Sequence, residues 1–216
     1  NHSATHLLHA ALRRNLGPHV TQKGSQVEAD RFRFDFSHNA AISREDLDRI
    51  EAEVNAVIRQ NDEAQTKLMK PQEAIEAGAM ALFGEKYGDE VRVLTLGHAL
   101  DGDKPYSVEL CGGTHVRRTG DIALFTILSE SAVAAGVRRI EGTTGAAALD
   151  FLKKQAALGR QAADELKTTL AELPERAAKL ADEKRKLDRE LADVKKKLAL
   201  AGPATGVGAA GAEETI

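Results

Sequence analysis

The stretch Cys111-Gly112-Gly113-Thr114-His115, written CGGTH, contains the only cysteine of this 216-residue chain. Thiolate sulfur and imidazole nitrogen are both ligands that zinc binds well in proteins. Two glycines between the two side chains let the backbone bend tightly, so that both can reach one ion. The stretch therefore predicts half of a metal site, whose other half lies elsewhere in the chain.

The other half is predicted at the amino terminus, in the sequence NHSATHLLH. If this segment is helical, His2 and His6 lie one turn apart on the same face and can converge on one ion. Three imidazoles and one thiolate suit tetrahedral zinc. We therefore predict that His2, His6, Cys111 and His115 bind one Zn²⁺, and we interpret His9 as a residue that packs beside these ligands or supports them.

A closed set of four protein ligands is typical of structural zinc, whereas catalytic zinc keeps a position open for water or substrate. The sequence leaves both roles open.

The rest of the first 146 residues predicts an α+β domain with a mainly antiparallel sheet. Hydrophobic periodicity predicts an amphipathic helix at 2–16 and a second helix from Ser43 to about Asn61, and Pro71 opens a short third helix. Alternating or β-branched patterns predict strands at 20–27 (with a turn at Lys23-Gly24), 31–36, 64–69, 91–96, 106–110, 122–129 and 137–142. The three phenylalanines of 31–36 are expected to face one core.

Residues 147–201 show a different pattern, with apolar residues in steps of three and four and charged residues between them. This pattern is typical of a coiled coil. Pro174 is tolerated in the first turn of a helix but not in its interior, so we predict two helices in an antiparallel hairpin near Leu173 rather than one kinked rod. The Gly- and Ala-rich residues 202–216 are predicted to form a flexible linker to a C-terminal domain absent from this chain.

Composition limits the cellular compartment and the kinds of partner that we expect for this chain. One cysteine excludes an internal disulfide framework, no apolar run is long enough to span a bilayer, and no signal sequence is present, so we expect a cytoplasmic protein. The formal charge of -3 gives no overall basic field, so contacts with nucleic acid would need local patches such as Arg138-Arg139. The first residue is Asn, which suggests a part of a longer protein.

Several segments, in order, resemble the editing domain of alanyl-tRNA synthetases. They are HSATHLLHAALR (2–13), QKGS (22–25), RFDFSH (33–38), GAMALFGEKY (78–87), ELCGGTH (109–115) and GVRRIE (136–141). The resemblance runs to about residue 147 and implies the second-additional-domain fold shared with threonyl-tRNA synthetases. Only the segment 97–106 looks longer than usual, and we expect a surface loop there.

The resemblance implies that the chain hydrolyses tRNA(Ala) mischarged with serine or glycine, as part of a ligase that uses ATP in a domain not present here. The metal ligands of the family fall on the four residues predicted above. Its substrate-binding residues fall on Thr5 and Gln22, and Arg138 and Arg139 would contact the acceptor end of the tRNA. No catalytic residue is assigned.

Three alternatives stay open. The chain could be a free-standing editing hydrolase of the same family, or a zinc-stabilised RNA-binding or dimerisation module without catalysis. The coiled coil, or the absent C-terminal domain, could also pair two chains into a homodimer.

Overall fold

The computed structural model describes residues 1–76, 78–80 and 88–201. Its elements, in chain order, are α1 (His2–Leu16), β1 (Gln22–Val27), β2 (Phe32–Ser37), α2 (Arg44–Gln60), β3 (Gln65–Met69), α3 (Pro71–Glu76), β4 (Val91–His98), β5 (Pro105–Leu110), the 3₁₀ turn η1 (Thr119–Ile122), β6 (Phe125–Ala134), β7 (Val137–Thr144), α4 (Gly145–Glu165) and α5 (Leu173–Ala201). The segment 81–87 of the resemblance and the predicted linker 202–216 lie outside the described residues.

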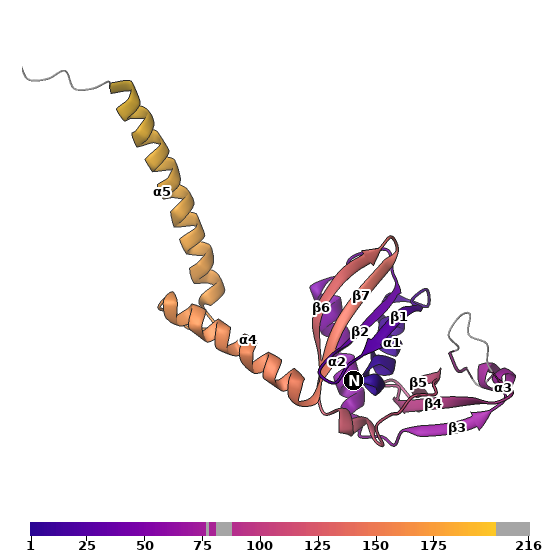
Figure 1. The fold of residues 1–216 in the computed structure, drawn as a ribbon. Coiled ribbons are helices and arrows are strands. Elements are labelled where there is room, and N and C mark those ends of the chain that lie inside the picture. Colours follow the sequence, from indigo (N-terminus) through magenta and orange to yellow (C-terminus); the bar gives the residue numbers. More distant parts are fainter. Residues whose placement is uncertain (77, 81–87, 202–216) are drawn as a thin grey trace, which may run out of the picture. The chain divides into compact units, whose positions relative to one another are not determined.

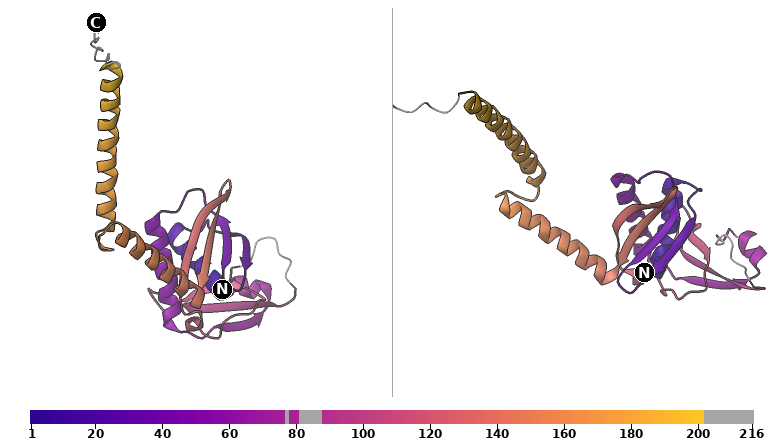
Figure 2. Two further views of the ribbon diagram at one scale, coloured as in Figure 1. Left: turned by 60° about the vertical axis from the view of Figure 1, so that its left-hand side comes forward. Right: turned by 45° about the horizontal axis from the view of Figure 1, so that its top comes forward.

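The strands form two antiparallel sheets, one of four strands in the order β1-β2-β7-β6 and one of three in the order β3-β4-β5. Figures 1 and 2 show the two sheets beside one another, with the strands of one running across the direction of the other. Helices and antiparallel sheets are thus mixed in one domain, and the predicted α+β class is confirmed.

Helix α1 is the centre of this domain. It contacts α2, η1, β2, β4 and β5, and every residue from Ser3 to Leu12 is buried. The helix was predicted correctly, but its amphipathic character was not, because neighbours on several sides also cover its polar residues. These polar residues therefore need partners inside the protein.

The three phenylalanines of β2 confirm the predicted alternation. Phe32, Phe34 and Phe36 are at most 1% exposed, and Phe32 stacks near Phe125 of β6 with 5.9 Å between ring centroids. Side chains at every second position of a strand share one face, so the three rings enter the same core.

Strand β1 differs from the prediction, because it does not turn at Lys23-Gly24. It continues to Val27, and the pairing with β2 shifts register between Gln22 and Gly24. A residue inserted into one strand in this way forms a bulge, which changes the direction in which neighbouring side chains point. The glycine therefore belongs to a bulge and not to a hairpin.

Helix α2 begins and ends as the sequence predicts. The Ser43 hydroxyl accepts a hydrogen bond from the Asp46 amide at 3.0 Å, and Asn61 ends the helix in the left-handed conformation. Within the helix, Asn55 bonds both the carbonyl and the amide of Phe125, at 2.8 and 2.9 Å, and so fixes α2 to the start of β6.

Two predicted boundaries are wrong. The surface loop expected at 97–106 is shorter, because β4 extends to His98 and β5 starts at Pro105. Ile122 lies in η1 and not in a strand, and β6 begins at Phe125. In both places backbone pairing between strands decided the boundary, and side-chain pattern did not.

The chain divides into two compact units, Asn1–Lys153 and Lys154–Ile216, whereas the predicted domain boundary at residue 146 falls at the start of α4. In the second unit a link at 166–172 separates α4 from α5, and Pro174 lies in the first turn of α5. Two helices with a turn at this place fit the predicted coiled-coil hairpin. Leu166 and Leu170, which the apolar pattern includes, lie in the link.

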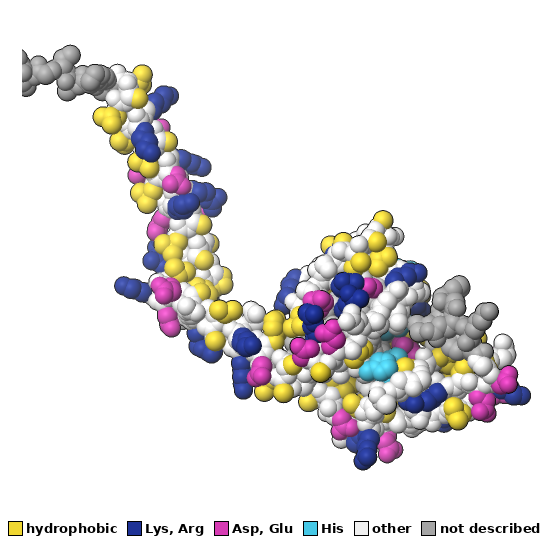
Figure 3. Space-filling model, viewed as in Figure 1, with side chains coloured by type: hydrophobic (Ala, Val, Ile, Leu, Met, Phe, Trp, Pro, Cys, Tyr) yellow, Lys and Arg dark blue, Asp and Glu magenta, His cyan; other side chains and the backbone are white. Residues whose placement is uncertain are grey.

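Helix α5 carries an exposed apolar stripe with heptad-like spacing, made of Leu187, Leu191, Val194 and Leu198. Figure 3 shows hydrophobic and charged side chains interspersed along this helix. None of the described helices combines the length and the hydropathy needed to cross a membrane.

The close packing around β7 gives a stability prediction. A Cβ atom at Gly142 would lie 2.8 Å from a Phe125 ring atom and 2.9 Å from a Phe32 ring atom. Because the rings are buried and cannot move away freely, we expect Gly142→Ala to lower the free energy of unfolding by about 1–3 kcal/mol in urea denaturation.

Gly102→Ala is the control for that variant, since a Cβ there meets nothing within 4 Å. It should change the stability by less than about 0.5 kcal/mol. Equal stabilities of the two variants would contradict the packing described for β7.

Candidate metal centre and adjoining cavity

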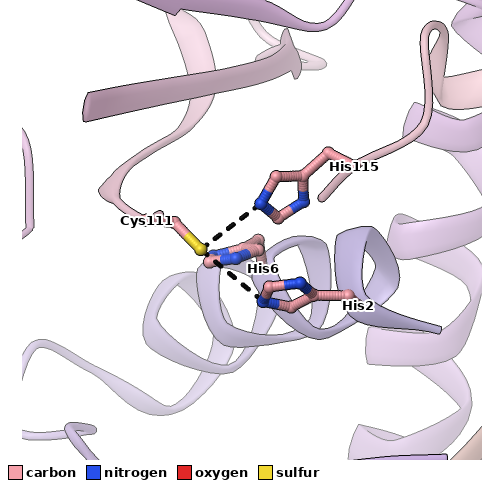
Figure 4. A group of neighbouring side chains, drawn as sticks. All are labelled: His2, His6, Cys111 and His115. Atoms are coloured by element: carbon pink, nitrogen blue, oxygen red, sulfur yellow. Dashed lines mark hydrogen bonds between the residues drawn. The ribbon is translucent and has the colours of Figure 1, made fainter. Parts of the chain in front are cut away.

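Two distant parts of the chain bring four ligand side chains together. His2 and His6 come from the first turns of α1, and Cys111 and His115 come from the segment after β5 (Figure 4). One potential ligand atom from each residue lies within 4.8 Å of all the others. The structure therefore assembles the four residues that the sequence predicted as one group able to hold a metal ion.

The spacing of the ligand atoms fits tetrahedral coordination. The Cys111 Sγ atom lies 3.3 Å from Nε2 of His115 and 3.6 Å from Nε2 of His2. With the usual zinc-sulfur and zinc-nitrogen distances, a tetrahedron has a nitrogen-to-sulfur edge of about 3.6 Å.

In two of the three histidines, His6 and His115, the nitrogen that faces away from the group is held by the protein. His6 Nδ1 lies 2.6 Å from a carboxylate oxygen of Glu109, and His115 Nδ1 lies 3.2 Å from the Ser3 hydroxyl. His6 Nε2, in contrast, is buried and has no hydrogen-bond partner among the described residues. Ligating histidines typically show this arrangement, with one nitrogen bonded to the protein and the other free for the ion.

The electrostatics of the group favour a cation. Burial alone would raise the pKa of the Cys111 thiol, but its bonds to His115 and His2 and the nearby ring of His6 outweigh this and lower the pKa to about 3. Cys111 is therefore a thiolate at neutral pH, which is the form that binds metals. Burial would lower the pKa of His6, but Cys111 and Glu109 raise it to about 9, so a metal ion would displace a proton here.

Glu109 was not among the predicted site residues, although it organises the group. Its two oxygens accept bonds from His6 Nδ1 at 2.6 Å and from His9 Nδ1 at 3.0 Å. Burial would raise the pKa of this carboxyl, but the two histidines lower it to about 2. The sequence feature that could have predicted Glu109 is the two-residue period of a strand. Residues 107, 109 and 111 share one face of β5 and its continuation, so Glu109 lies on the same side as Cys111.

Gly113 is required for a reason other than the predicted bend. Neither Gly112 nor Gly113 has a positive φ. A Cβ atom at Gly113 would instead overlap Cε1 of His2 and lie 2.8 Å from its Nδ1. The guanidinium of Arg92 donates a hydrogen bond to the Gly113 carbonyl and holds this segment in place.

A cavity of about 590 Å³ adjoins the four ligands. Its lining includes His2, His6, His9, Cys111, Thr5 and Gln22. The two residues that the resemblance gives as substrate-binding thus line the same cavity as three members of the metal group. Histidine side chains reach the surface of the domain in the space-filling view (Figure 3).

The bulge in β1 accounts for the position of Gln22. The consecutive residues Thr21, Gln22 and Lys23 all line the cavity, whereas in a regular strand successive side chains point to opposite faces. The Thr5 hydroxyl donates to the Asn1 carbonyl at 3.2 Å, and the Gln22 amide forms no hydrogen bond within the described residues.

Arg138 and Arg139 are both engaged within the domain. Arg138 bonds Glu130 through Nη2 at 2.6 Å, and Arg139 bonds Asp35 through two nitrogens at 2.6 and 2.8 Å. The lowered pKa of Asp35 follows chiefly from its bond to Arg139. Both guanidinium groups thus already bind carboxylates of the domain. The contact of Arg138 and Arg139 with tRNA stays a prediction.

Comparison with known proteins shows which family the chain resembles. Residues 91–141 match the family described as the threonyl and alanyl tRNA synthetase second additional domain. Relatives named alanine-tRNA ligase match from Hyphomonas neptunium, 62% identical over 216 residues, and from Rhizorhabdus wittichii, 65% identical over 204 residues. These matches cover 100% and 94% of this chain, but only 24% and 23% of the relatives.

The chain thus belongs to the class of proteins that carry the second additional domain of threonyl- and alanyl-tRNA synthetases. Within that class it is a member of the alanine-tRNA ligase family and spans about a quarter of the length of the relatives it matches. The resemblance drawn from the sequence is confirmed.

The contact between Gly113 and His2 can be tested by substitution. We expect Gly113→Ala to displace the His2 ring and to weaken metal binding by about 10–100-fold, because the ligand can no longer reach its position. Competition with a chromophoric chelator, using Zn²⁺, measures this affinity.

Gly112→Ala is the matched control, since a Cβ there meets nothing within 4 Å and its backbone is not in the left-handed region. Its affinity for Zn²⁺ should equal that of the unaltered chain. An unchanged affinity in Gly113→Ala would show that His2 is not a ligand.

Proposed function

We propose that this chain binds one Zn²⁺ at His2, His6, Cys111 and His115 and hydrolyses Ser-tRNA(Ala) and Gly-tRNA(Ala). The observation that carries the proposal is the shared cavity, in which Thr5 and Gln22 lie with three of the four metal-group residues. A volume of about 590 Å³ suits a ligand the size of an aminoacylated adenosine.

The need for such a reaction follows from the limits of binding. A site that accepts alanine cannot strongly reject an amino acid that differs by one hydroxyl, and aminoacyl-tRNA synthetases for small amino acids meet this limit with a second, hydrolytic site. That second site must spare the alanine ester. It can do so with buried polar groups that the alanine ester would leave unpaired.

Thr5 and Gln22 supply groups of this kind. The Thr5 hydroxyl donates its hydrogen to the Asn1 carbonyl, so its oxygen can accept a bond from the serine hydroxyl. The Gln22 amide can donate to the same hydroxyl, because nothing in the described chain engages it. The pair would thus recognise the serine hydroxyl both as a hydrogen-bond donor and as an acceptor.

The proposed reaction is attack of water on the carbonyl carbon of the aminoacyl ester. The bond from this carbon to the ribose oxygen breaks, and the free amino acid and the tRNA hydroxyl leave. A bound Zn²⁺ would supply a positive charge that polarises the ester or orients the substrate. Cys111 is a poor nucleophile in this setting, because its sulfur is committed to the metal group.

The activity of a whole ligase is also a proposal. We propose that this chain acts together with segments equivalent to the parts of the relatives that it does not match. Those segments would ligate alanine to tRNA(Ala) with ATP in the cytoplasm. Arg138 and Arg139 would then contact phosphates near the acceptor end. The apolar stripe of α5 would pair with α4 in a hairpin or with a second chain in a homodimer.

The central test measures deacylation of Ser-tRNA(Ala), Gly-tRNA(Ala) and Ala-tRNA(Ala) by the zinc-loaded chain. We expect hydrolysis of the first two and not of the third. Cys111→Ala should lose at least about 100-fold in rate, because the metal group loses its thiolate.

Intact Ser-tRNA(Ala) after incubation with folded protein carrying one equivalent of zinc would instead favour an RNA-binding module with a structural ion. A free-standing hydrolase and a ligase part are separated by adding the remaining segments of a relative, since only the latter gains activity from them.

The role of Thr5 gives a sharper prediction. Thr5→Val keeps the shape of the side chain but removes the hydroxyl, so the ratio of Ser-tRNA(Ala) to Ala-tRNA(Ala) hydrolysis should fall about 10-fold or more. The matched control is Thr21→Val, because the Thr21 hydroxyl also belongs to a cavity residue but bonds Ser37 at 2.8 Å. If both variants keep the ratio, Thr5 does not recognise the serine hydroxyl.

A further inference from the structure

We propose that His9 binds the α-ammonium group of the aminoacyl ester through its Nε2 atom. This inference rests on the proposed function, because the group that it binds belongs to the substrate of that reaction. It deepens that function by assigning a role in substrate binding to a residue that the sequence indicated only as a packing or supporting side chain.

His9 occupies a position suited to a ligand contact. It lies on α1 three residues after His6, its side chain is 6% exposed, and it lines the cavity. One side of the imidazole packs against Phe34, with 5.2 Å between ring centroids. The ring is thus fixed by packing and cannot easily turn to find another partner.

The bond to Glu109 determines which nitrogen of His9 carries the hydrogen. Nδ1 lies 3.0 Å from a carboxylate oxygen, and a carboxylate can only accept, so Nδ1 must donate. A neutral imidazole with its hydrogen on Nδ1 presents a lone pair at Nε2. In this tautomer Nε2 of His9 is an acceptor and not a donor.

That acceptor has no partner in the described part of the chain. Nε2 of His9 and Nε2 of His6 are both buried and unpaired there, although buried polar atoms of proteins are nearly always bonded. For His6 the metal group explains the open atom. For His9, which is not a member of that group, a donor from a bound ligand is the matching explanation.

The two residues with open atoms line one cavity. His6 and His9 bond the two oxygens of the same carboxylate, at 2.6 and 3.0 Å, and both residues line the same cavity. A substrate held at the metal group therefore has His9 as a neighbour. The negative charge of Glu109 also makes the His9 ring a stronger acceptor.

The α-ammonium group is the donor that fits. The serine and glycine esters both carry it, whereas the hydroxyl belongs only to serine. Different residues then bind different groups of the substrate. Thr5 and Gln22 recognise the side chain, and His9 recognises the amine common to all aminoacyl esters.

The test compares two hydrolysis-resistant ligands, 3′-(L-serylamino)-3′-deoxyadenosine and its counterpart in which a 3-hydroxypropanoyl group replaces seryl and so lacks the amine. Calorimetry on the full, zinc-loaded chain measures both affinities. We expect the amine to improve binding about tenfold in the unaltered protein, the effect of one charge-assisted hydrogen bond.

Two variants isolate Nε2. In His9→Asn the side-chain amide can still donate to Glu109 but has no atom at the position of Nε2, so the preference for the amine should fall to about onefold. His9→Gln can place its amide oxygen near the position of Nε2 and should restore part of the preference. Zinc content and melting temperature, measured for both, show whether the fold and the metal group are intact.

The outcomes separate the two proposals. A tenfold preference retained in a folded, zinc-loaded His9→Asn protein, or equal affinity of the unaltered chain for both ligands, overturns the role of His9. In that case hydrolysis of Ser-tRNA(Ala) by the unaltered chain still supports the proposed function. If the unaltered chain neither binds the ligands nor hydrolyses the ester, both proposals fall.

Discussion

The burial of α1 on all sides is the constraint on which the rest of this structure depends. A helix in the centre of a domain cannot leave polar side chains in water, and from Ser3 to His9 this one carries four of them inside. Each buried polar group must find a partner or lose stability. The strand β5 and the segment after it supply the partners of Ser3, His6 and His9, whereas the Thr5 hydroxyl bonds the Asn1 carbonyl. Packing α1 into the core therefore also assembles the site.

Glu109 shows how this constraint becomes chemistry. Its carboxylate bonds two histidines of α1 and thereby fixes which nitrogen of each ring remains free. Together with the thiolate of Cys111 it places two negative charges beside imidazoles in a largely buried site. A divalent cation would balance these charges, which is the physical reason why the group suits a metal.

Small backbone features complete the site. Gly113 lets the CGGTH segment approach the His2 ring, and the bulge at Lys23 lets the consecutive residues 21–23 line one cavity. Neither feature contributes a functional group. Both decide whether the groups that do are within reach of one ligand, and this is why a glycine and an irregular strand lie beside the cavity.

The sequence by itself determined the local elements and the metal group. Helix periodicity placed His2 and His6 on one face, the alternation of Phe32, Phe34 and Phe36 marked a strand, and Ser43 and Pro174 marked two helix starts, because each of these signals depends only on near neighbours. Only the tertiary structure decided that α1 is buried all round, that Glu109 joins His6 to His9, and that Gln22 faces the cavity through a bulge. These features depend on which faces of segments far apart in the sequence pack against each other. The spacing of residues along the chain does not specify that packing.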